Sequence, residues 1–243
     1  MRKITIALFV FICSQSLHSQ TWFDIGFKGG YGADFLINSN FYNDSNFNPK
    51  LSYGYMYGGK VGINFNTEHS ITLDVSSSVF NQSFNYTLKN LNNTTSENTR
   101  SMGFDALNFL LMYKKTTNSS YLEIGPQYSI VTKTRFSDSN VPNANSDISS
   151  DLVKSYFSAV IGFGGQIVGT DNFGISLGLR VSYTFSDIVS SVGQQINFPS
   201  ITTYPSYKPS NPLSAMLILS FDFDLGYIAK SGGNHRRSKF LMF

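Results

Sequence analysis

The chain has 243 residues, of which 14% are charged and 15% are aromatic, and its formal net charge is +3. So small a charge gives no support to nucleic-acid binding, and the low charged fraction argues against a disordered chain or a solvated helical bundle. One stretch, at the extreme N-terminus, is continuously apolar, which excludes a polytopic helical membrane protein. The length suits one domain or one medium β-barrel.

Residues 1–19 have the features of a secretory signal peptide. A basic start is followed by an apolar run over 4–12, and the small residue Ser19 precedes the expected cleavage site. The apolar run is about half the ~20 residues that a membrane anchor needs. Ile12 is bulky where a lipoprotein signal needs a small residue before Cys13. We therefore expect cleavage without lipidation and a mature chain that lacks cysteine.

Eight segments of the remaining chain alternate between apolar residues and polar residues or glycine with a period of two. A strand places such sets on opposite faces, whereas a helix would mix them. The segments cover, in chain order, 22–37, 53–65, 71–86, 102–113, 122–133, 157–167, 173–185 and 213–227.

The alternation is broken in two neighbouring segments. The apolar residues of the third change parity near Val79 and Phe80, and in the fourth Phe104 and Ala106 have the wrong parity. A β-bulge in each strand would explain both breaks. Dry packing on both faces of these strands is the alternative.

The connections between the segments also alternate, in length. Those at 66–69, 116–120 and 169–172 are short turns. An even number of strands with short turns at one end and long loops at the other is typical of an outer-membrane barrel. We therefore predict an all-β fold, an eight-stranded antiparallel up-and-down transmembrane β-barrel over residues 20–228, with mobile loops outside and both termini in the periplasm. The long connections, rich in Asn, Ser and Thr, cover 38–52, 87–101, 137–153 and 186–212.

A soluble β-sandwich or a lipocalin-like barrel would show the same alternation. Those folds place polar residues outside, usually many of Lys, Glu, Thr and Asp. In this chain the polar set is small, rich in glycine and poor in charge, which suits a narrow lumen. The apolar set is large and aromatic, as lipid contact requires, and this favours the transmembrane barrel.

Eight strands leave an interior about wide enough for side chains alone, which excludes a wide porin. The few inward charges should pair, because an unpaired charge in a confined space is costly. Arg180 is expected to bind Asp222 or Asp224 on the neighbouring strand. The network is interpreted as a plug that holds the barrel together, with a proton or small-ion path as the alternative. Its predicted members are Lys28, Lys60, Asp74, Glu123, Arg180, Asp222 and Asp224.

Catalysis is not expected. The usual hydrolytic chemistry of small outer-membrane barrels needs a histidine near the outer rim. His18 leaves with the signal, His69 lies in a predicted periplasmic turn, and His235 lies in the tail. The acidic residues of the loop 137–153 match no EF-hand spacing. We predict no catalytic residue, no cofactor and no metal site.

Residues 229–243 form a short basic tail, too short for a periplasmic domain. We expect it to touch lipid headgroups, with docking to a periplasmic or assembly partner as the alternative.

The opening Trp-Phe-Asp-Ile-Gly-Phe-Lys-Gly-Gly-Tyr-Gly (22–32) and the closing aromatic strand (217–225) resemble those of the small outer-membrane β-barrel family of Gram-negative bacteria, the OmpA-like, OmpX-like and PorT-like barrels. The resemblance implies roles in membrane integrity, surface adhesion or secretion, and no functional residues carry over.

We therefore expect a non-enzymatic protein of the bacterial outer membrane with a structural or surface-interaction role, presenting four extracellular loops. An accessory subunit of a secretion or export machinery, similar to type IX systems, is the alternative, and a lipid-modifying enzyme is less favoured. The expected partners are outer-membrane lipid and lipopolysaccharide, the barrel assembly machinery, and an envelope or secretion protein.

Overall fold

The computed structural model describes residues 21–89, 94–141, 147–170 and 172–227. The predicted signal peptide and the basic tail lie outside these ranges. Within them, no helix is both long and apolar enough to span a membrane.

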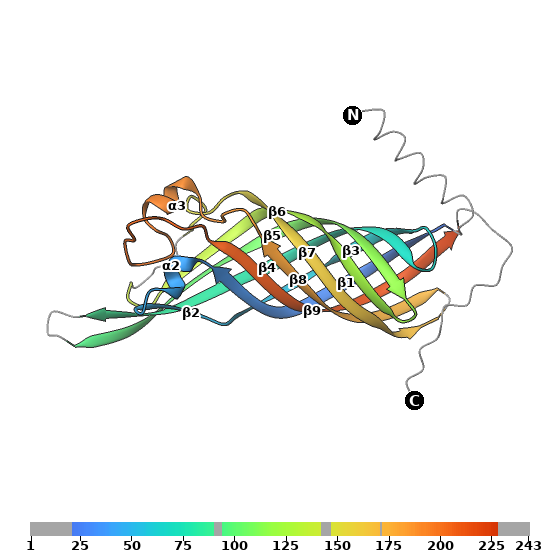
Figure 1. The fold of residues 1–243 in the computed structure, drawn as a ribbon, viewed down its shortest axis with the longest axis horizontal. Helices are drawn as coiled ribbons and strands as arrows, with labels where there is room; N and C mark the ends of the chain where they lie inside the picture. The colour runs from blue at the N-terminus through green and yellow to red at the C-terminus, as the bar shows by residue number, and fades with distance from the viewer. Residues whose placement is uncertain (1–20, 90–93, 142–146, 171, 228–243) are drawn as a thin grey trace, which may run out of the picture.

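Nine antiparallel strands and two short helices make up the described part of the chain (Figure 1). The helices are α2 (Ser39–Tyr42) and α3 (Ser191–Gln195). The strands are β1 (Trp22–Ile37), β2 (Phe47–Lys50), β3 (Ser52–Asn64), β4 (His69–Lys89), β5 (Thr95–Thr117), β6 (Ser120–Asp138), β7 (Ser155–Gly169), β8 (Phe173–Thr184) and β9 (Asn211–Tyr227).

The sheet closes in a ring. Its strand order is β2-β4-β3-β1-β9-β8-β7-β6-β5, and a further pairing between β4 and β5 joins the two sides. The short β2 pairs with β4 near its far end, Phe47 opposite Tyr86. The all-β antiparallel class is therefore confirmed, with the predicted short turns between β3 and β4, β5 and β6, and β7 and β8.

The outer wall of the ring is apolar. Phe27, Tyr57 and Leu217 are among its side chains, each about 60% exposed. Their neighbours in sequence point inward, because successive side chains of a strand alternate between faces. A closed apolar belt of this size would be unfavourable in water, so the wall has the chemistry of a lipid-facing surface.

The prediction of a bulge in the third and fourth segments is wrong, and the alternative of dry packing is right. In β4 the even-numbered residues stay inside throughout, with Phe80 buried like Ser70. Phe104 and Ala106 of β5 also point inward and are buried. Along the strand, the inward residues change from polar to aromatic. In the sequence, this change looks like a switch of the apolar residues from odd to even positions. A register shift does occur nearby, where β6 places an extra residue opposite Asp105 and Ala106.

The predicted loop 87–101 is mostly strand. The β4–β5 ladder runs on to Lys89 opposite Thr95, and the hairpin projects beyond the ring at the left of Figure 1. The alternation of the inner face continues to Tyr86 and Leu88, and this pairing extends the strands beyond the segments that we predicted.

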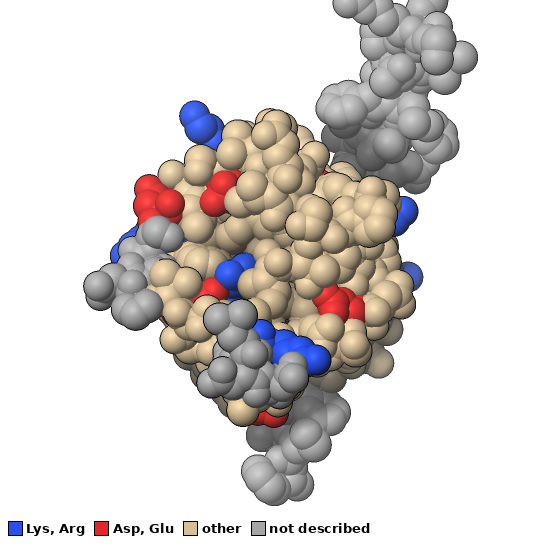
Figure 2. Space-filling view, turned by 90° about the vertical axis from the view of Figure 1, so that its left-hand side faces the viewer, with Lys and Arg blue, Asp and Glu red and all other residues tan. Residues whose placement is uncertain are grey.

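The described parts of the three other long connections are folded against one another, in contrast to the mobile loops that we expected. The connection after β1 forms α2 and β2, and that before β9 forms α3. Leu152 and Val189 form an isolated antiparallel bridge between two of these connections. Figure 2, which views this outer end, shows a mostly uncharged face with scattered acidic and basic side chains.

Candidate functional site

The interior of the ring is the candidate site, and the inner face of β4 passes through its four layers. We call the end where β1 begins the lower mouth, and the layers the vestibule, the waist, the chamber and the plug. From the lower mouth outward, β4 contributes Ser70 and Thr72 to the vestibule and Asp74 to the waist. It then contributes Ser76 and Ser78 to the chamber, and Phe80, Phe84 and Tyr86 to the plug.

One half of the waist is a cluster around Asp74. The ammonium group of Lys28 lies 2.6 Å from Asp74 Oδ2, and Arg180 Nη2 lies 3.1 Å from the same oxygen. Arg180 also donates to Glu123 Oε1 through Nε at 2.8 Å and Nη2 at 2.6 Å. All four side chains are buried. Two cations and two carboxylates thus form one neutral cluster, as charges need when they leave water.

The other half of the waist is centred on Lys60. Its Nζ lies 3.2 Å from Asp24 Oδ2 and 3.0 Å from Asp222 Oδ1. The structure therefore brings six of the seven predicted residues into ion pairs and adds Asp24. Asp224 lies at the lower mouth, where it accepts a hydrogen bond from Trp22 Nε1 at 3.3 Å.

The expected pairing of Arg180 with Asp222 or Asp224 is not what the structure shows. On β9 the residue opposite Arg180 is Met216, whereas Asp222 lies opposite Gly174. Six residues of strand separate Met216 from Asp222, about 20 Å at ~3.3 Å per residue. The antiparallel register thus places these carboxylates far below the guanidinium, and Arg180 turns to Glu123 across β7.

Glycine on the intervening strand makes room for these pairs. Gly162 of β7 lies opposite both Glu123 of β6 and Arg180 of β8. A β-carbon at Gly162 would lie 2.6 Å from Glu123 Oε1. Gly26 of β1 likewise lies between Lys60 and Asp222. Each long ion pair therefore spans three strands, because the middle strand has no side chain at that level.

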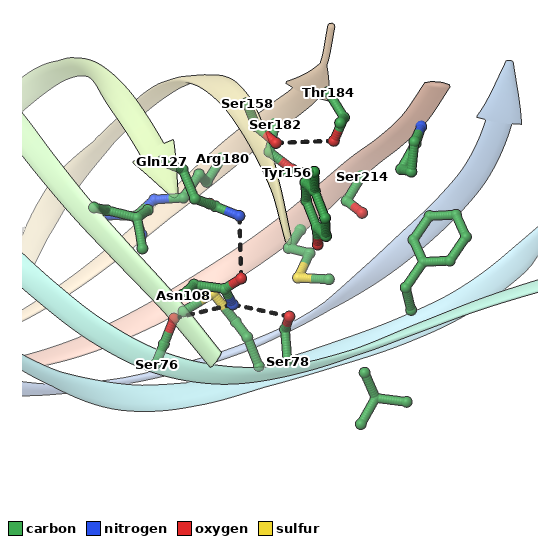
Figure 3. Close-up of a pocket in the computed structure, with 16 residues that line it drawn as sticks. Ser76, Ser78, Asn108, Gln127, Tyr156, Ser158, Arg180, Ser182, Thr184 and Ser214 are labelled. Carbon is green, nitrogen blue, oxygen red and sulfur yellow. Dashed lines mark hydrogen bonds between the residues drawn. The ribbon is translucent and has the colours of Figure 1, made fainter. Parts of the chain in front are cut away.

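The chamber lies above the waist, and hydroxyl and amide side chains line it together with apolar residues such as Met56 and Met216 (Figure 3). Asn108 is its hub: Nδ2 donates to Ser78 Oγ at 2.9 Å, and Oδ1 accepts from Ser129 Oγ at 2.7 Å and Gln127 Nε2 at 3.2 Å. Its volume is about 50 Å³, and a water molecule needs ~10–15 Å³ of such space. The chamber can therefore hold a few water molecules.

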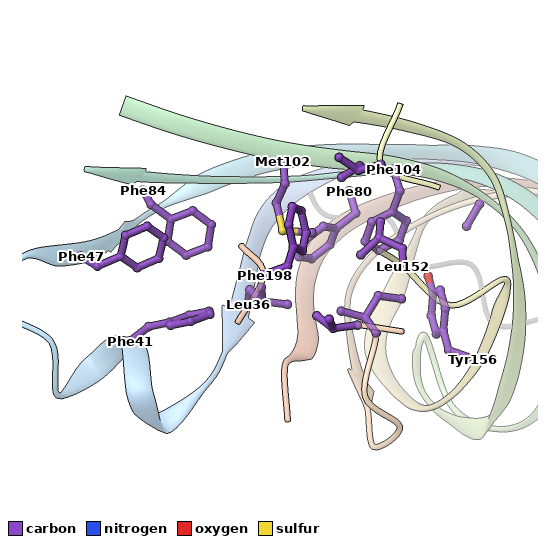
Figure 4. Close-up of a cluster of buried hydrophobic side chains, with 14 of the residues drawn as sticks. Leu36, Phe41, Phe47, Phe80, Phe84, Met102, Phe104, Leu152, Tyr156 and Phe198 are labelled. Carbon is purple, nitrogen blue, oxygen red and sulfur yellow. The ribbon is translucent and has the colours of Figure 1, made fainter. Parts of the chain in front are cut away.

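The plug is a cluster of buried apolar side chains at the outer end of the interior (Figure 4). Phe80 and Phe104 stack with ring centroids 4.9 Å apart, and Phe104 meets Tyr156 edge-on at 5.9 Å. Loop residues complete this core from outside, with Phe41 of α2 against Phe47 and Phe84. The buried members are Leu36, Phe41, Phe47, Phe80, Phe84, Tyr86, Met102, Phe104, Ala106, Ile148, Leu152, Tyr156, Ile188, Val189 and Phe198.

Arg100 attaches the connection between β8 and β9 to the strands. Its Nη1 donates to the carbonyl oxygens of Pro199 at 2.9 Å and Ser200 at 3.1 Å. Its Nε and Nη2 both donate to Asp138 Oδ2, at 2.8 and 2.6 Å. The guanidinium also lies 5.3 Å from the ring centre of Phe136. Few hydrogen-bonding positions of this side chain are left for solvent, so the clamp holds the connection in one place.

Two tyrosines of the connection between β8 and β9 donate hydrogen bonds to carboxylates. The hydroxyl of Tyr204 donates to Asp44 Oδ2 at 2.9 Å, and that of Tyr207 donates to Asp187 Oδ2 at 2.8 Å. Burial raises the pKa of Tyr204 to about 12, and the charge of Asp44 acts in the same direction. Burial also raises the pKa of Tyr207, again assisted by its carboxylate.

The vestibule is a cavity of about 330 Å³ at the lower mouth. Lys114 of β5 lines it and lies over the ring of Tyr121, with Nζ 4.2 Å from the ring centre. Neither residue is among those predicted from the sequence. The even-residue parity that places Lys28 inside could have identified Lys114 as an inward cation.

The histidine that the structure describes, His69, does not lie at the outer end. His69 begins β4 at the lower mouth, where Nδ1 lies 2.6 Å from the hydroxyl oxygen of Tyr113. His235 lies outside the described ranges. Among the residues that the structure describes, no three His, Cys, Asp or Glu side chains are placed to hold a metal ion.

Comparison with known proteins identifies the family. Residues 14–190 match the outer membrane protein β-barrel domain family. The chain belongs to this family, and it is a β-barrel protein of the bacterial outer membrane. No curated protein matches the sequence.

Three solved structures are among those to which the chain is similar. Neisserial surface protein A is 11% identical over 83% of this chain and 96% of its own, with a TM-score of 0.42. OprG from Pseudomonas aeruginosa is 10% identical over 86% and 97%, with a TM-score of 0.42. The outer membrane protease OmpT from Escherichia coli is 8% identical over 86% and 98%, with a TM-score of 0.36.

Proposed function

We propose that the chain is an eight-stranded transmembrane barrel that is closed to solutes and has no enzymatic activity. Its outer connections, which include α2, β2 and α3, present a rigid surface outside the cell, and we call this surface the platform. The long strands form the ring, and β2 belongs to the platform. The shortest strand of the ring, β8, has 12 residues, which is enough for a tilted strand that needs ~9–11 residues to span a membrane. Short turns at the lower mouth favour a periplasmic position for that end.

The plug is the observation that carries this proposal. It joins the inner walls of β4 and β5 to three of the four outer connections in one aromatic core. A core of this kind blocks the lumen and fixes the shape of the outer surface, because close-packed side chains rarely leave voids larger than a water molecule. A structural or surface-interaction role uses both properties, whereas a proton or small-ion path would need a polar route through the plug.

The expected partners follow from the surfaces. The apolar wall would contact membrane lipid and lipopolysaccharide. The aromatic alternation of β9, with Phe221 and Phe223 exposed, would present a signal to the barrel assembly machinery. The alternative role in secretion depended on residues 229–243, which lie outside the described ranges.

Two measurements test the proposal. In planar bilayers the purified protein should show no conductance above the lipid baseline. In intact cells, surface crosslinking should give a product with the wild-type protein that is lost when 186–210 is replaced by a short Gly-Ser turn. The shift in gel mobility on boiling would show that this variant still forms a barrel. Steady conductance by the wild-type protein would contradict the closed lumen, and unchanged crosslinking would contradict the role of the platform.

A further inference from the structure

The vestibule contains the one inward cation that has no acidic partner among the described residues. Lys28, Lys60 and Arg180 each lie within 3.2 Å of a carboxylate oxygen. In the part of the chain that the structure describes, no carboxylate lies within 4.0 Å of Lys114, and its contact is the ring of Tyr121.

The register of the strands explains why Lys114 is left over. Its cross-strand neighbour on β6 is Glu123, which would be the natural partner of the ammonium group. Glu123 turns away across Gly162 and accepts both hydrogen bonds from Arg180. Lys114 therefore borders the open cavity without an ion pair to a described carboxylate, and Asp222 and Glu123 act on its charge only from a longer distance.

Acidic groups line the same cavity. Asp24 and Asp222 border it together with Lys114, and they share the single ammonium group of Lys60. The Oδ1 atom of Asp24 is buried without a hydrogen-bond partner in the structure. The vestibule thus presents a cation without an ion pair on one wall, and two carboxylates that share one ammonium group on another.

We propose that the vestibule binds a small zwitterion, such as an amino acid or a short peptide. The carboxylate of the ligand would bind Lys114, and its ammonium group would face Asp24 and Asp222. A dianion such as phosphate would be repelled by the carboxylates, and a simple cation would leave Lys114 without a partner. The cavity has the size of a small-molecule site, and Trp22 and Tyr121 supply aromatic surface beside the charges. This inference goes beyond the proposed surface role, because it concerns the opposite end of the barrel.

The chain carries its own reporter for this site. Trp22 is the single tryptophan of the sequence and lines the vestibule. The purified full-length protein in detergent would be titrated with glycylglycine while tryptophan fluorescence is recorded. We expect a saturable change, with acetate, ethylammonium and inorganic phosphate each binding at least ten-fold more weakly. A linear response to glycylglycine, or equal binding of phosphate, would overturn the proposal.

Two neighbouring lysines provide a matched pair of variants. Lys114→Met should weaken the binding of glycylglycine at least ten-fold. Lys115→Met should leave it unchanged, because Lys115 is the next residue of β5 and is exposed. Wild-type affinity in a folded Lys114→Met barrel would overturn the assignment of the carboxylate subsite. If Lys114→Met fails to show the mobility shift on boiling, the smaller change Lys114→Gln replaces it, and the comparison of the four probes on the wild-type protein still decides whether a zwitterion site exists.

Discussion

Replacement of Arg180 tests whether the waist holds the barrel together. Arg180→Met keeps an unbranched side chain of intermediate length but removes the guanidinium. Glu123 then loses both of its hydrogen bonds from Arg180, and Asp74 keeps only Lys28. Two buried carboxylates would face one ammonium group, which lies 4.0 Å from Glu123.

The magnitude follows from the contacts that are lost. Three charge-assisted hydrogen bonds at ~1.5–3 kcal/mol each set an upper bound, and they are not additive because they share acceptors. Removing one partner of a buried ion pair costs about 3–5 kcal/mol. With a urea dependence of about 2 kcal/mol per molar, we expect the unfolding midpoint in detergent to fall by about 2 M.

Two further variants make the experiment decisive. Lys208→Met removes an exposed charge from an outer connection and should leave the midpoint unchanged. The double variant Arg180→Met, Glu123→Gln should regain part of the lost stability, because the second change removes the unpaired charge. If Arg180→Met unfolds at the same midpoint as Lys208→Met, the ion pairs of the waist do not stabilise the barrel and the reasoning is wrong.

Three other predictions follow from the glycine gaps, the tyrosine of the platform and the arginine clamp. Gly26→Ala should lower the urea midpoint, because its β-carbon would lie 2.6 Å from a backbone carbonyl oxygen of β9, whereas Gly29→Ala, with nothing within 4 Å, should not. Tyr204 has a pKa of about 12 in the folded protein and ~10 when unfolded, so its contribution to stability is complete below pH ~10 and is lost as the pH rises towards 12. Absorbance of tyrosinate should show this late titration in the wild-type protein, and in Tyr204→Phe its amplitude should fall by one residue while that of Tyr207 remains. Arg100→Met should speed protease cleavage within 186–212 while the urea midpoint of the strands changes little, and equal cleavage rates would contradict the clamp.

The outer wall could be predicted from the sequence because lipid contact imposes one rule on every strand. The odd residues from Phe23 to Tyr31 in β1 and from Leu217 to Leu225 in β9 are large and apolar whatever lies opposite them, apart from Gly29. The inward direction of Arg180 followed from the same alternation. Local pattern suffices for these features, since the face on which a side chain lies depends on its parity alone.

The interior could not be predicted to the same depth, because it depends on register between strands and on packing between distant loops. Nothing local to Arg180 indicates that Glu123 lies across a glycine from it. Phe80 and Phe104 occupy inward positions that we expected to be polar throughout the lumen. In the sequence they therefore looked like residues on the wrong face of the strand. Phe41 and Phe198 stand in segments rich in Asn and Ser, where single apolar residues give no periodic signal.

The ion pairs of the waist connect residues of several strands around the ring, and we call this connected set the girdle. The pair that crosses Gly26 joins β3 to β9 over β1, and the pair that crosses Gly162 joins β6 to β8 over β7. Asp74 of β4 then connects the two groups across the lumen through cations from β1 and β8. Every strand of the ring except β5 contributes to the girdle, either with a charged side chain or with the glycine beneath one. The inward lysine of β5, Lys114, instead lines the vestibule. Loss of this side chain should therefore change ligand binding at the lower mouth more than it changes the girdle.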